Sequence, residues 1–269
     1  MGSLLRTQRP RIASIASVLK RHAHMVLDPL RTQPLKHAID RVVKPGDVVL
    51  DIGTGIGLLA FFACHAGAKH VYAIDVDAES LRVAGWYTQE LGLSDRITFI
   101  EGLSFSLELE RKVDVIICET IGQVGFEENI LATLRDAKQR LLKRNGRIIP
   151  ERIELWGALA SATSLLSKPQ QLVVIDTQKK FDDCIHLTPH FCSTREGKLT
   201  GITCWPRVTW AKGFVTDAAP TKPRTHWGQA HLDISPQRVH RGEEFAFELI
   251  VQPDSRCKRT DTEILWRLT

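Results

Sequence analysis

The chain has 269 residues, of which 43% are hydrophobic and 25% are charged, and its formal net charge is +5. This length is enough to bury a core in one large domain or in two modest ones. No apolar run reaches the roughly 18 residues that a membrane helix requires. The N-terminus shows no apolar signal core and the six cysteines form no C-x-x-C pair, so a cytoplasmic protein with reduced thiols is expected.

The positive charge is concentrated at the start of the chain. Residues 1–44 hold nine lysines and arginines against two carboxylates, whereas the remaining 225 residues hold 27 against 29. A basic arm can contact nucleic acid or an acidic partner, but such a run is more often a solvated face. Nucleic acid is therefore not the expected partner.

Helical and strand-like patterns alternate through the first 150 residues. Helices are expected at about 12–26 and 32–43, before a turn at 44–47. Strands are then expected at 48–52, 71–75, 97–101, 113–118 and 146–149, and helices at about 58–66, 79–91 and 128–143. This alternation predicts an α/β fold, in which a parallel sheet carries helices on both faces.

The pattern changes after Pro150. Residues 151–269 contain short β-like runs, such as 152–158, 231–234 and 244–251, and no long helix is evident. We expect three regions: a helical cap over 1–44, a Rossmann-like domain over 45–150, and a smaller, mostly β domain over 151–269.

A glycine-rich turn over residues 49–59 is the first candidate binding feature. An apolar strand runs into glycines 53, 55 and 57, which allow a tight turn and a close approach of a ligand to the backbone. The next strand ends near Asp75, about 20 residues on, where an acid suits a ribose diol. Dehydrogenases and many nucleotide-binding proteins share such a turn, so it does not define a reaction by itself.

Two carboxylates are the candidate chemical groups. Glu119 ends an apolar strand, and Glu128 follows nine residues later at the expected start of a helix. One interpretation is a pocket with two acids. The other is a strand-end acid followed by an acid that favours the positive end of a helix dipole. The spacing alone leaves both interpretations open.

The two acids, with Gly122 and Phe126 between them, resemble the double-E loop of the protein arginine N-methyltransferases. Three further elements resemble that family in the same order: Met25 to Thr32 (Met-x-x-Asp-x-x-Arg-Thr), the glycine turn with Asp75, and Thr225-His226-Trp227. The resemblance runs from about Met25 to the C-terminus. It implies a Rossmann-like S-adenosylmethionine-dependent methyltransferase domain followed by a smaller β-barrel-like domain.

The resemblance also implies roles for individual residues. Arg31 would clamp the methionine carboxylate of S-adenosylmethionine, Asp75 would bind its ribose, and S-adenosylhomocysteine would be the product. Glu119 and Glu128 would grip the substrate guanidinium, Asp28 would pair with His226, and Trp227 would wall the substrate pocket. The implied cofactor-binding residues are Met25, Arg31, Asp51, Gly53, Thr54, Gly55, Asp75, Val76, Ser104, Phe105 and Glu119, and the implied catalytic residues are Glu119, Glu128, His226 and Asp28.

These residue types suit the chemistry. A guanidinium stays protonated near neutral pH and is a poor nucleophile. Two carboxylates can hold its planar fork, localise its charge on one side and direct the other nitrogen at a methyl donor, so positioning does most of the work. Either Glu128 or the Asp28–His226 pair is placed to take the proton.

The chain also departs from the family pattern. Residues 1–24 contain no Tyr or Phe, although family members carry paired tyrosines there, and Ser104-Phe105 stands where an adenine-binding glutamate is usual. Only 74 residues separate Pro150 from Thr225, so the dimerisation arm is trimmed or absent, with residues 164–180 as the one candidate remnant. A homodimer stays open, and a small guanidino substrate such as free arginine gains weight beside an arginine-containing protein or peptide.

Three alternative functions stay open: methylation of another amine, cofactor binding without transfer, and RNA methylation by way of the basic arm. A separate alternative concerns metal. Cys184, His186, His190 and Cys192 lie within nine positions, and zinc uses such residue types, although its usual sites have other spacings. We expect no metal in the candidate site.

Overall fold

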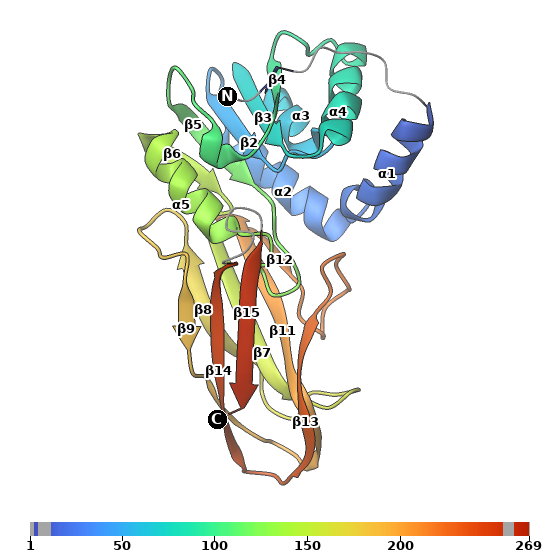
Figure 1. Cartoon of the computed structure of the whole chain (residues 1–269), viewed down its shortest axis with the longest axis vertical. Coiled ribbons are helices and arrows are strands. Elements are labelled where there is room, and N and C mark those ends of the chain that lie inside the picture. Colours follow the sequence, from blue (N-terminus) through green and yellow to red (C-terminus); the bar gives the residue numbers. More distant parts are fainter. Residues whose placement is uncertain (1–2, 5–11, 255–260, 269) are drawn as a thin grey trace. The chain divides into compact units, whose positions relative to one another are not determined.

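The computed structural model describes residues 3–4, 12–254 and 261–268, which fold into two compact units (Figure 1). We call them the α/β unit and the β unit. The α/β unit comprises Met1–Glu119, Thr133–Glu151 and Thr209–Thr216, and the β unit comprises Thr120–Ala132, Arg152–Val208 and Asp217–Thr269. Both units are therefore discontinuous in sequence, because the chain crosses between them at several points.

A six-stranded sheet forms the centre of the α/β unit, in the order β1-β4-β3-β2-β5-β6. The last five strands in that order are parallel, and only β1 runs antiparallel, to β4. The strands are β1 (Ser3–Leu4), β2 (Val48–Ile52), β3 (His70–Asp75), β4 (Ile97–Glu101), β5 (Val113–Cys118) and β6 (Leu142–Ile149). Central residues such as Leu50 and Ile116 are fully buried, as expected for a sheet that is covered on both faces.

The described helices are α1 (Ile12–Val26), α2 (Pro29–Val42), α3 (Leu58–His65), α4 (Ala78–Glu90) and α5 (Ile130–Arg140), with a short 3-10 helix η1 (Ser104–Ser106). All belong to the α/β unit except the first three residues of α5, which belong to the β unit. Helix α2 begins three residues before the expected position. Pro29 fits the first helical turn, and the Asp28 side chain accepts a hydrogen bond from Leu30 N at 2.9 Å, which caps the helix.

Helix α5 is shorter at both ends than the expected range of 128–143. Asn129 has a φ of 56°, a left-handed conformation that a helix does not accommodate. At the other end, Leu142 is buried and already begins strand β6. Tertiary packing therefore overrides the helical pattern in both places.

The β unit consists mainly of antiparallel strands in two sheets. One sheet has the order β12-β11-β7-β8, with β13 also paired to β11, and the other has the order β10-β14-β15, with β9 paired to β14. Their bounds are β7 (Arg152–Ala160), β8 (Gln170–Asp176), β9 (Ile185–Leu187), β10 (His190–Cys192), β11 (Gly197–Ala211), β12 (Phe214–Asp217), β13 (Ala230–Val239), β14 (Glu244–Pro253) and β15 (Thr262–Leu268). The end of β11 and most of β12 belong to the α/β unit.

The structure confirms the predicted fold class, a Rossmann-like domain followed by a β domain. The candidate remnant of a helical arm at 164–180 contains strand β8, which pairs with β7. Within the described residues of 152–269 no helix is assigned. None of the described helices has the length and apolar character that a membrane span requires.

Candidate active site

The glycine turn joins β2 to α3 at the carboxyl edge of the parallel sheet. Gly53, Gly55 and Gly57 have φ values of 72°, 55° and 84°, in the left-handed region that favours glycine. The backbone N–H groups of Gly53 and Thr54 both donate to Ile74 O, at 2.9 and 3.1 Å, which ties the turn to strand β3. The turn thus lies where parallel sheets bind ligands.

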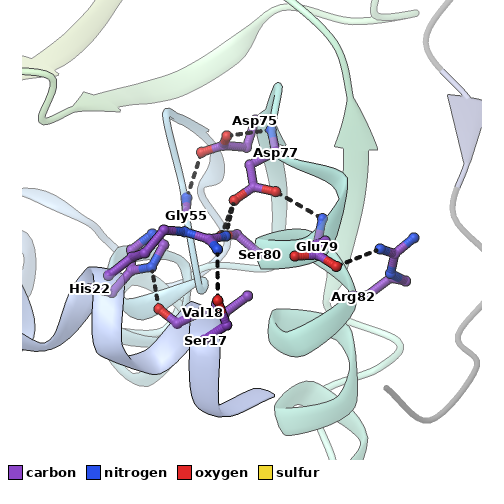
Figure 2. A network of polar contacts seen from close by, with 10 residues as sticks. Ser17, Val18, His22, Gly55, Asp75, Asp77, Glu79, Ser80 and Arg82 are labelled. Carbon is purple, nitrogen blue, oxygen red and sulfur yellow. Dashed lines mark hydrogen bonds and ion pairs between the residues drawn. The ribbon is translucent and has the colours of Figure 1, made fainter. Parts of the chain in front are cut away.

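Asp75 is held beside this turn (Figure 2). Its Oδ2 accepts a hydrogen bond from Gly55 N at 2.7 Å, and its Oδ1 accepts one from Asp77 N at 2.9 Å. Between the two acids, Val76 leaves 58% of its surface exposed, an unusual fraction for a large aliphatic residue at a strand end. Asp75 and Val76 therefore offer a fixed carboxylate and an open apolar surface side by side.

Helix α1 contributes a residue that the sequence analysis missed, His22. Its Nδ1 lies 2.9 Å from Val18 O, and a Cβ added to Gly55 would lie only 3.0 Å from its Nε2 (Figure 2). The ring therefore packs directly over the glycine turn. Its spacing of three residues from Met25, which places both on one side of a helix, is the signal that points to it.

An ion pair fastens α1 to the start of α4. Arg21 Nη2 lies 2.8 Å from Asp77 Oδ2. Asp77 also caps α4, because its side chain accepts hydrogen bonds from Glu79 N at 3.0 Å and from Ser80 Oγ at 2.7 Å. These contacts hold the pKa of the Asp77 carboxyl below its usual value, against an opposing effect of burial. The pair therefore ties α1, whose His22 packs against Gly55, to the start of α4.

Arg31 and Glu119 form a buried ion pair in the α/β unit. Arg31 Nε donates to Glu119 Oε2 at 2.8 Å, Nη2 contacts the same oxygen, and Nη1 donates to Met25 O at 3.2 Å. Their side chains are only 8% and 4% exposed. Both contacts of Arg31 with Glu119 fall on Oε2. One predicted cofactor ligand and one predicted substrate ligand are therefore in direct contact.

Asp51 is the buried acid beneath the turn. Thr54 Oγ1 donates to its Oδ2 at 2.6 Å, whereas its buried Oδ1 has no partner in the described part of the chain. Burial raises the pKa of this carboxyl to about 7; the Thr54 hydrogen bond opposes that shift, and the nearby charge of Asp75 adds to it. A carboxyl this deep in the sheet is costly to ionise.

Ser104 and Phe105 follow strand β4 in the 3-10 helix η1. The Ser104 carbonyl accepts a hydrogen bond from Arg140 Nη2 at 2.7 Å, and its side chain is buried. Phe105 is half-buried. Within the α/β unit, the residues at or beside the carboxyl ends of β2 to β5 are Asp51, Gly53, Thr54, Gly55, Asp75, Val76, Ser104, Phe105 and Glu119, and Arg31 joins them through Glu119.

The remaining predicted residues belong to the β unit. Glu128 is exposed, and Trp227 is 3% exposed with its ring centroid 5.0 Å from that of His226. Asp28, the predicted partner of His226, is in the α/β unit, where it caps α2. A second residue missed by the sequence analysis, Glu127, organises the loop before Glu128 through its carboxylate.

The cysteine and histidine cluster does not gather into a metal site. His186 on β9 and His190 on β10 pair with different parts of β14, opposite Ile250 and Ala246. His186 Nε2 instead lies 2.9 Å from Glu248 Oε1. No group of three or more His, Cys, Asp or Glu residues is arranged to hold a metal ion within 12–254 and 261–268.

The residues of the α/β unit fit S-adenosylmethionine. Glycines with positive φ form a tight turn, and the His22 ring packs against Gly55 within it. Asp75 is a fixed acceptor for hydroxyl groups, and Arg31 is a buried guanidinium fork suited to a carboxylate. Ribose hydroxyls and an amino-acid carboxylate are polar groups that suit an acceptor and a guanidinium of this kind.

Comparisons with known proteins agree with this chemistry. Residues 32–153 match the family described as ribosomal protein L11 methyltransferase (PrmA). An arginine N(omega)-methyltransferase of Streptomyces achromogenes subsp. streptozoticus is 27% identical over 85% of this chain and 75% of its own length. Protein arginine N-methyltransferase 1 of Schizosaccharomyces pombe is 36% identical, over 50% of this chain and 40% of its own.

The solved structures show the same fold. The Trypanosoma brucei PRMT1 enzyme-prozyme heterotetrameric complex with AdoHcy superposes with a TM-score of 0.82, at 22% identity, over 93% of each chain. The chain thus has the fold of these structures, a Rossmann-like core with a β domain, and its residues 32–153 are similar to a methyltransferase family. In sequence the chain is similar to arginine N-methyltransferases, and the match covers only 40% of the Schizosaccharomyces pombe protein's length.

Proposed function

We propose that the protein transfers a methyl group from S-adenosylmethionine to a guanidino nitrogen of an arginine-type substrate. The observation that carries this proposal is the buried pair of Arg31 and Glu119 beside the glycine turn. In this pair, Arg31 is the guanidinium proposed to bind the cofactor carboxylate, and Glu119 is the carboxylate proposed to bind the substrate guanidinium. Both lie at one edge of the sheet. The named activity of the similar proteins supports the same reaction.

In this proposal the α/β unit binds the cofactor, which supplies an electrophilic methyl group. Asp75 accepts hydrogen bonds from the ribose, Val76 offers an apolar surface, and Arg31 binds the methionine carboxylate. Gly53 and Gly55 admit the ligand to the backbone, and Met25 and His22 on α1 lie over it. The contacts that hold Asp75 and His22 beside the turn support these roles.

The substrate guanidinium is held by carboxylates. Glu119 is oriented through Oε2 by Arg31 and is the first of the two carboxylates that accept hydrogen bonds from the substrate. Glu128 is the second carboxylate, and Trp227 lines the substrate pocket. Fixing the fork on one side leaves one terminal nitrogen to attack, and its proton passes to Glu128 or to the pair of Asp28 and His226.

The substrate is either a protein or peptide arginine or a small guanidino compound such as free arginine. The Streptomyces relative and the yeast relative carry names that correspond to these two choices. The trimmed β unit, in which β8 stands in the expected arm region, favours the smaller substrate. A homodimer is compatible with either choice.

A transfer assay with three acceptors tests the proposal. Labelled S-adenosylmethionine is incubated with free L-arginine, an Arg/Gly-rich peptide or total RNA, and the products are identified by mass spectrometry. Label on a guanidino nitrogen supports the proposal and selects the substrate class. Label on RNA alone overturns the guanidino acceptor and indicates RNA methylation. Label on none of the three, while calorimetry shows bound cofactor, also overturns it and leaves methylation of another amine.

A further inference from the structure

We infer that Glu127 is a positioning residue that fixes Glu128, and that strand β15 completes this arrangement from the far end of the chain. The inference rests on the proposed function, because it concerns the carboxylate assigned to the substrate guanidinium. All the contacts that carry it lie within the β unit, in the loop 120–129 and at Thr262.

The Glu127 carboxylate folds back onto its own loop. Its Oε1 accepts a hydrogen bond from Val124 N at 2.6 Å, and its Oε2 accepts one from Phe126 N at 3.1 Å. Bonds from backbone N–H groups to an ionised carboxylate are roughly twice as strong as neutral ones. A single side chain thus satisfies two backbone donors and closes the loop immediately before Glu128.

The glycines of the loop make room for this closure. A Cβ on Gly122 would lie 2.6 Å from both Cδ and Oε2 of Glu127, so any larger residue would displace the carboxylate. Gly125 has a φ of 89°, which a residue with a side chain rarely adopts, and its N–H donates to Gly122 O at 3.1 Å. Both glycines therefore serve the conformation that Glu127 holds.

Strand β15 fixes the backbone on both sides of Glu128. Thr262 N donates to Glu127 O at 3.0 Å, and Asn129 N donates to Thr262 Oγ1 at 3.1 Å. One threonine, more than 130 residues away in sequence, therefore binds the residue before Glu128 and the residue after it. Neither of these contacts uses the Glu128 side chain.

Asn129 adds a strained and buried residue directly after Glu128. It has a φ of 56°, is 2% exposed, and its Nδ2 has no partner among the described residues. A left-handed non-glycine residue is costly and persists only where surrounding contacts impose it. The backbone from 127 to 129 is thus held in one unusual conformation, which sets the direction of the Glu128 side chain.

Variants of Glu127 and Thr262 test this inference. Glu127→Ala removes both acceptors, Glu127→Gln keeps one, and Thr262→Val removes only the hydroxyl that binds Asn129 N. Gln123→Ala, an exposed residue of the same loop, is the matched control. We expect kcat/KM for the arginine acceptor to fall by about 10- to 100-fold in Glu127→Ala, less in the other two variants, and not in the control.

Two readouts separate positioning from a general loss of structure. The affinity for S-adenosylhomocysteine, measured by calorimetry, should stay within about twofold of wild type, because its proposed ligands lie in the α/β unit. The double variant Glu127→Ala/Glu128→Gln should be no slower than Glu128→Gln alone, since Glu127 acts through Glu128. Additive losses, or a Glu127→Ala variant as active as the control, would overturn the inference.

Amide hydrogen exchange keeps the test independent of catalysis. The N–H groups of Val124 and Phe126 should exchange at least about tenfold faster in Glu127→Ala than in Gln123→Ala, and the N–H of Asn129 should do so in Thr262→Val. Unchanged exchange at all three overturns the inference, whatever the acceptor is. Failure of the wild-type protein to methylate any arginine acceptor would instead count against the proposed function.

Discussion

Arg31 and Glu119, 88 residues apart in sequence, meet as an ion pair whose side chains are almost completely shielded from water. The pair links the start of α2 to the end of β5, and Arg31 also reaches the Met25 carbonyl at the end of α1. Three elements are thereby joined at one point. Since a buried charge without its partner is costly, this pair couples the stability of the α/β unit to its proposed ligand chemistry.

Replacing Glu119 should lower both the stability of the α/β unit and the rate of methyl transfer. Glu119→Gln keeps the shape but leaves Arg31 as a buried charge without its anionic partner, so we expect a loss of about 3 kcal/mol in the free energy of unfolding. Methyl transfer to an arginine acceptor should fall at least about 100-fold, because two carboxylates no longer oppose the guanidinium. Chemical denaturation and a transfer assay measure the two quantities.

Glu128→Gln should lower methyl transfer without lowering stability. Glu128 is exposed, so its replacement should leave the free energy of unfolding within about 0.5 kcal/mol of wild type. Transfer to arginine should still fall by about 100-fold or more. Glu110→Gln, an exposed acid in the loop before β5, is the control for both variants. A Glu128→Gln protein that transfers methyl at the wild-type rate would refute the guanidinium-binding role.

Arg31→Lys should weaken binding of the cofactor. Lysine keeps the positive charge but loses the planar fork, so it cannot contact Glu119 and a ligand carboxylate in a bidentate manner. We expect the affinity for S-adenosylhomocysteine to fall about tenfold or more, measured by calorimetry. An unchanged affinity would mean that Arg31 serves only to hold Glu119.

Asp51 should make stability depend on pH in an unusual direction. Its pKa of about 7 in the folded protein lies above the value of 3.8 expected for the unfolded chain, because burial disfavours the charged form. The folded state therefore binds the extra proton, and this stabilising contribution is present at low pH and is lost as the pH rises from about 4 to about 7. The loss is at most roughly 4 kcal/mol.

The Asp51→Asn variant isolates this contribution from other titrating groups. Asp77, Asp114 and Glu248 have lowered pKa values, so their contributions change in the opposite direction with pH. Denaturation of wild type and Asp51→Asn at several pH values should show wild type losing stability relative to the variant as the pH rises. A difference that does not vary between pH 4 and pH 8 would show that Asp51 does not titrate in this range.

The sequence predicted most of the parallel sheet because its strands are buried on both faces. Three strands have the expected bounds, at 48–52, 97–101 and 113–118. The helix at 12–26 also has its expected bounds. Continuous apolar runs and glycine turns are local signals, so they are visible without tertiary information. The class of fold followed from the same local signals, whereas S-adenosylmethionine was implied by the resemblance of the motifs to the arginine N-methyltransferases.

What the sequence could not show depends on long-range contacts. The Arg31–Glu119 pair and the contacts of Thr262 with Glu127 and Asn129 join residues that lie far apart in the chain. The segment Thr120–Ala132 belongs to the β unit, although in sequence it lies between β5 and β6, two strands of the parallel sheet. Alternating strands and helices carry no information about such packing. Glu127, adjacent to the predicted Glu128, was missed because its role comes from the folded loop.

The Arg21–Asp77 pair gives a last prediction, which concerns salt. The two side chains are 47% and 37% exposed, so the pair contributes roughly 0.2–1 kcal/mol and is screened by ions. Since it holds α1 against the start of α4, Arg21→Gln should weaken binding of S-adenosylhomocysteine by about two- to fivefold at low ionic strength. The difference from wild type should disappear at about 1 M salt.

Arg82→Gln is the matched control for this measurement. Arg82 also pairs with an acid of α4, lying 3.6 Å from Glu79, but this contact stays within one helix and does not involve α1. Its replacement should therefore leave the affinity unchanged at every salt concentration. An Arg21→Gln protein with the affinity of the Arg82→Gln control at low salt would show that the remaining contacts of α1, including those of His22, suffice to hold it over the glycine turn.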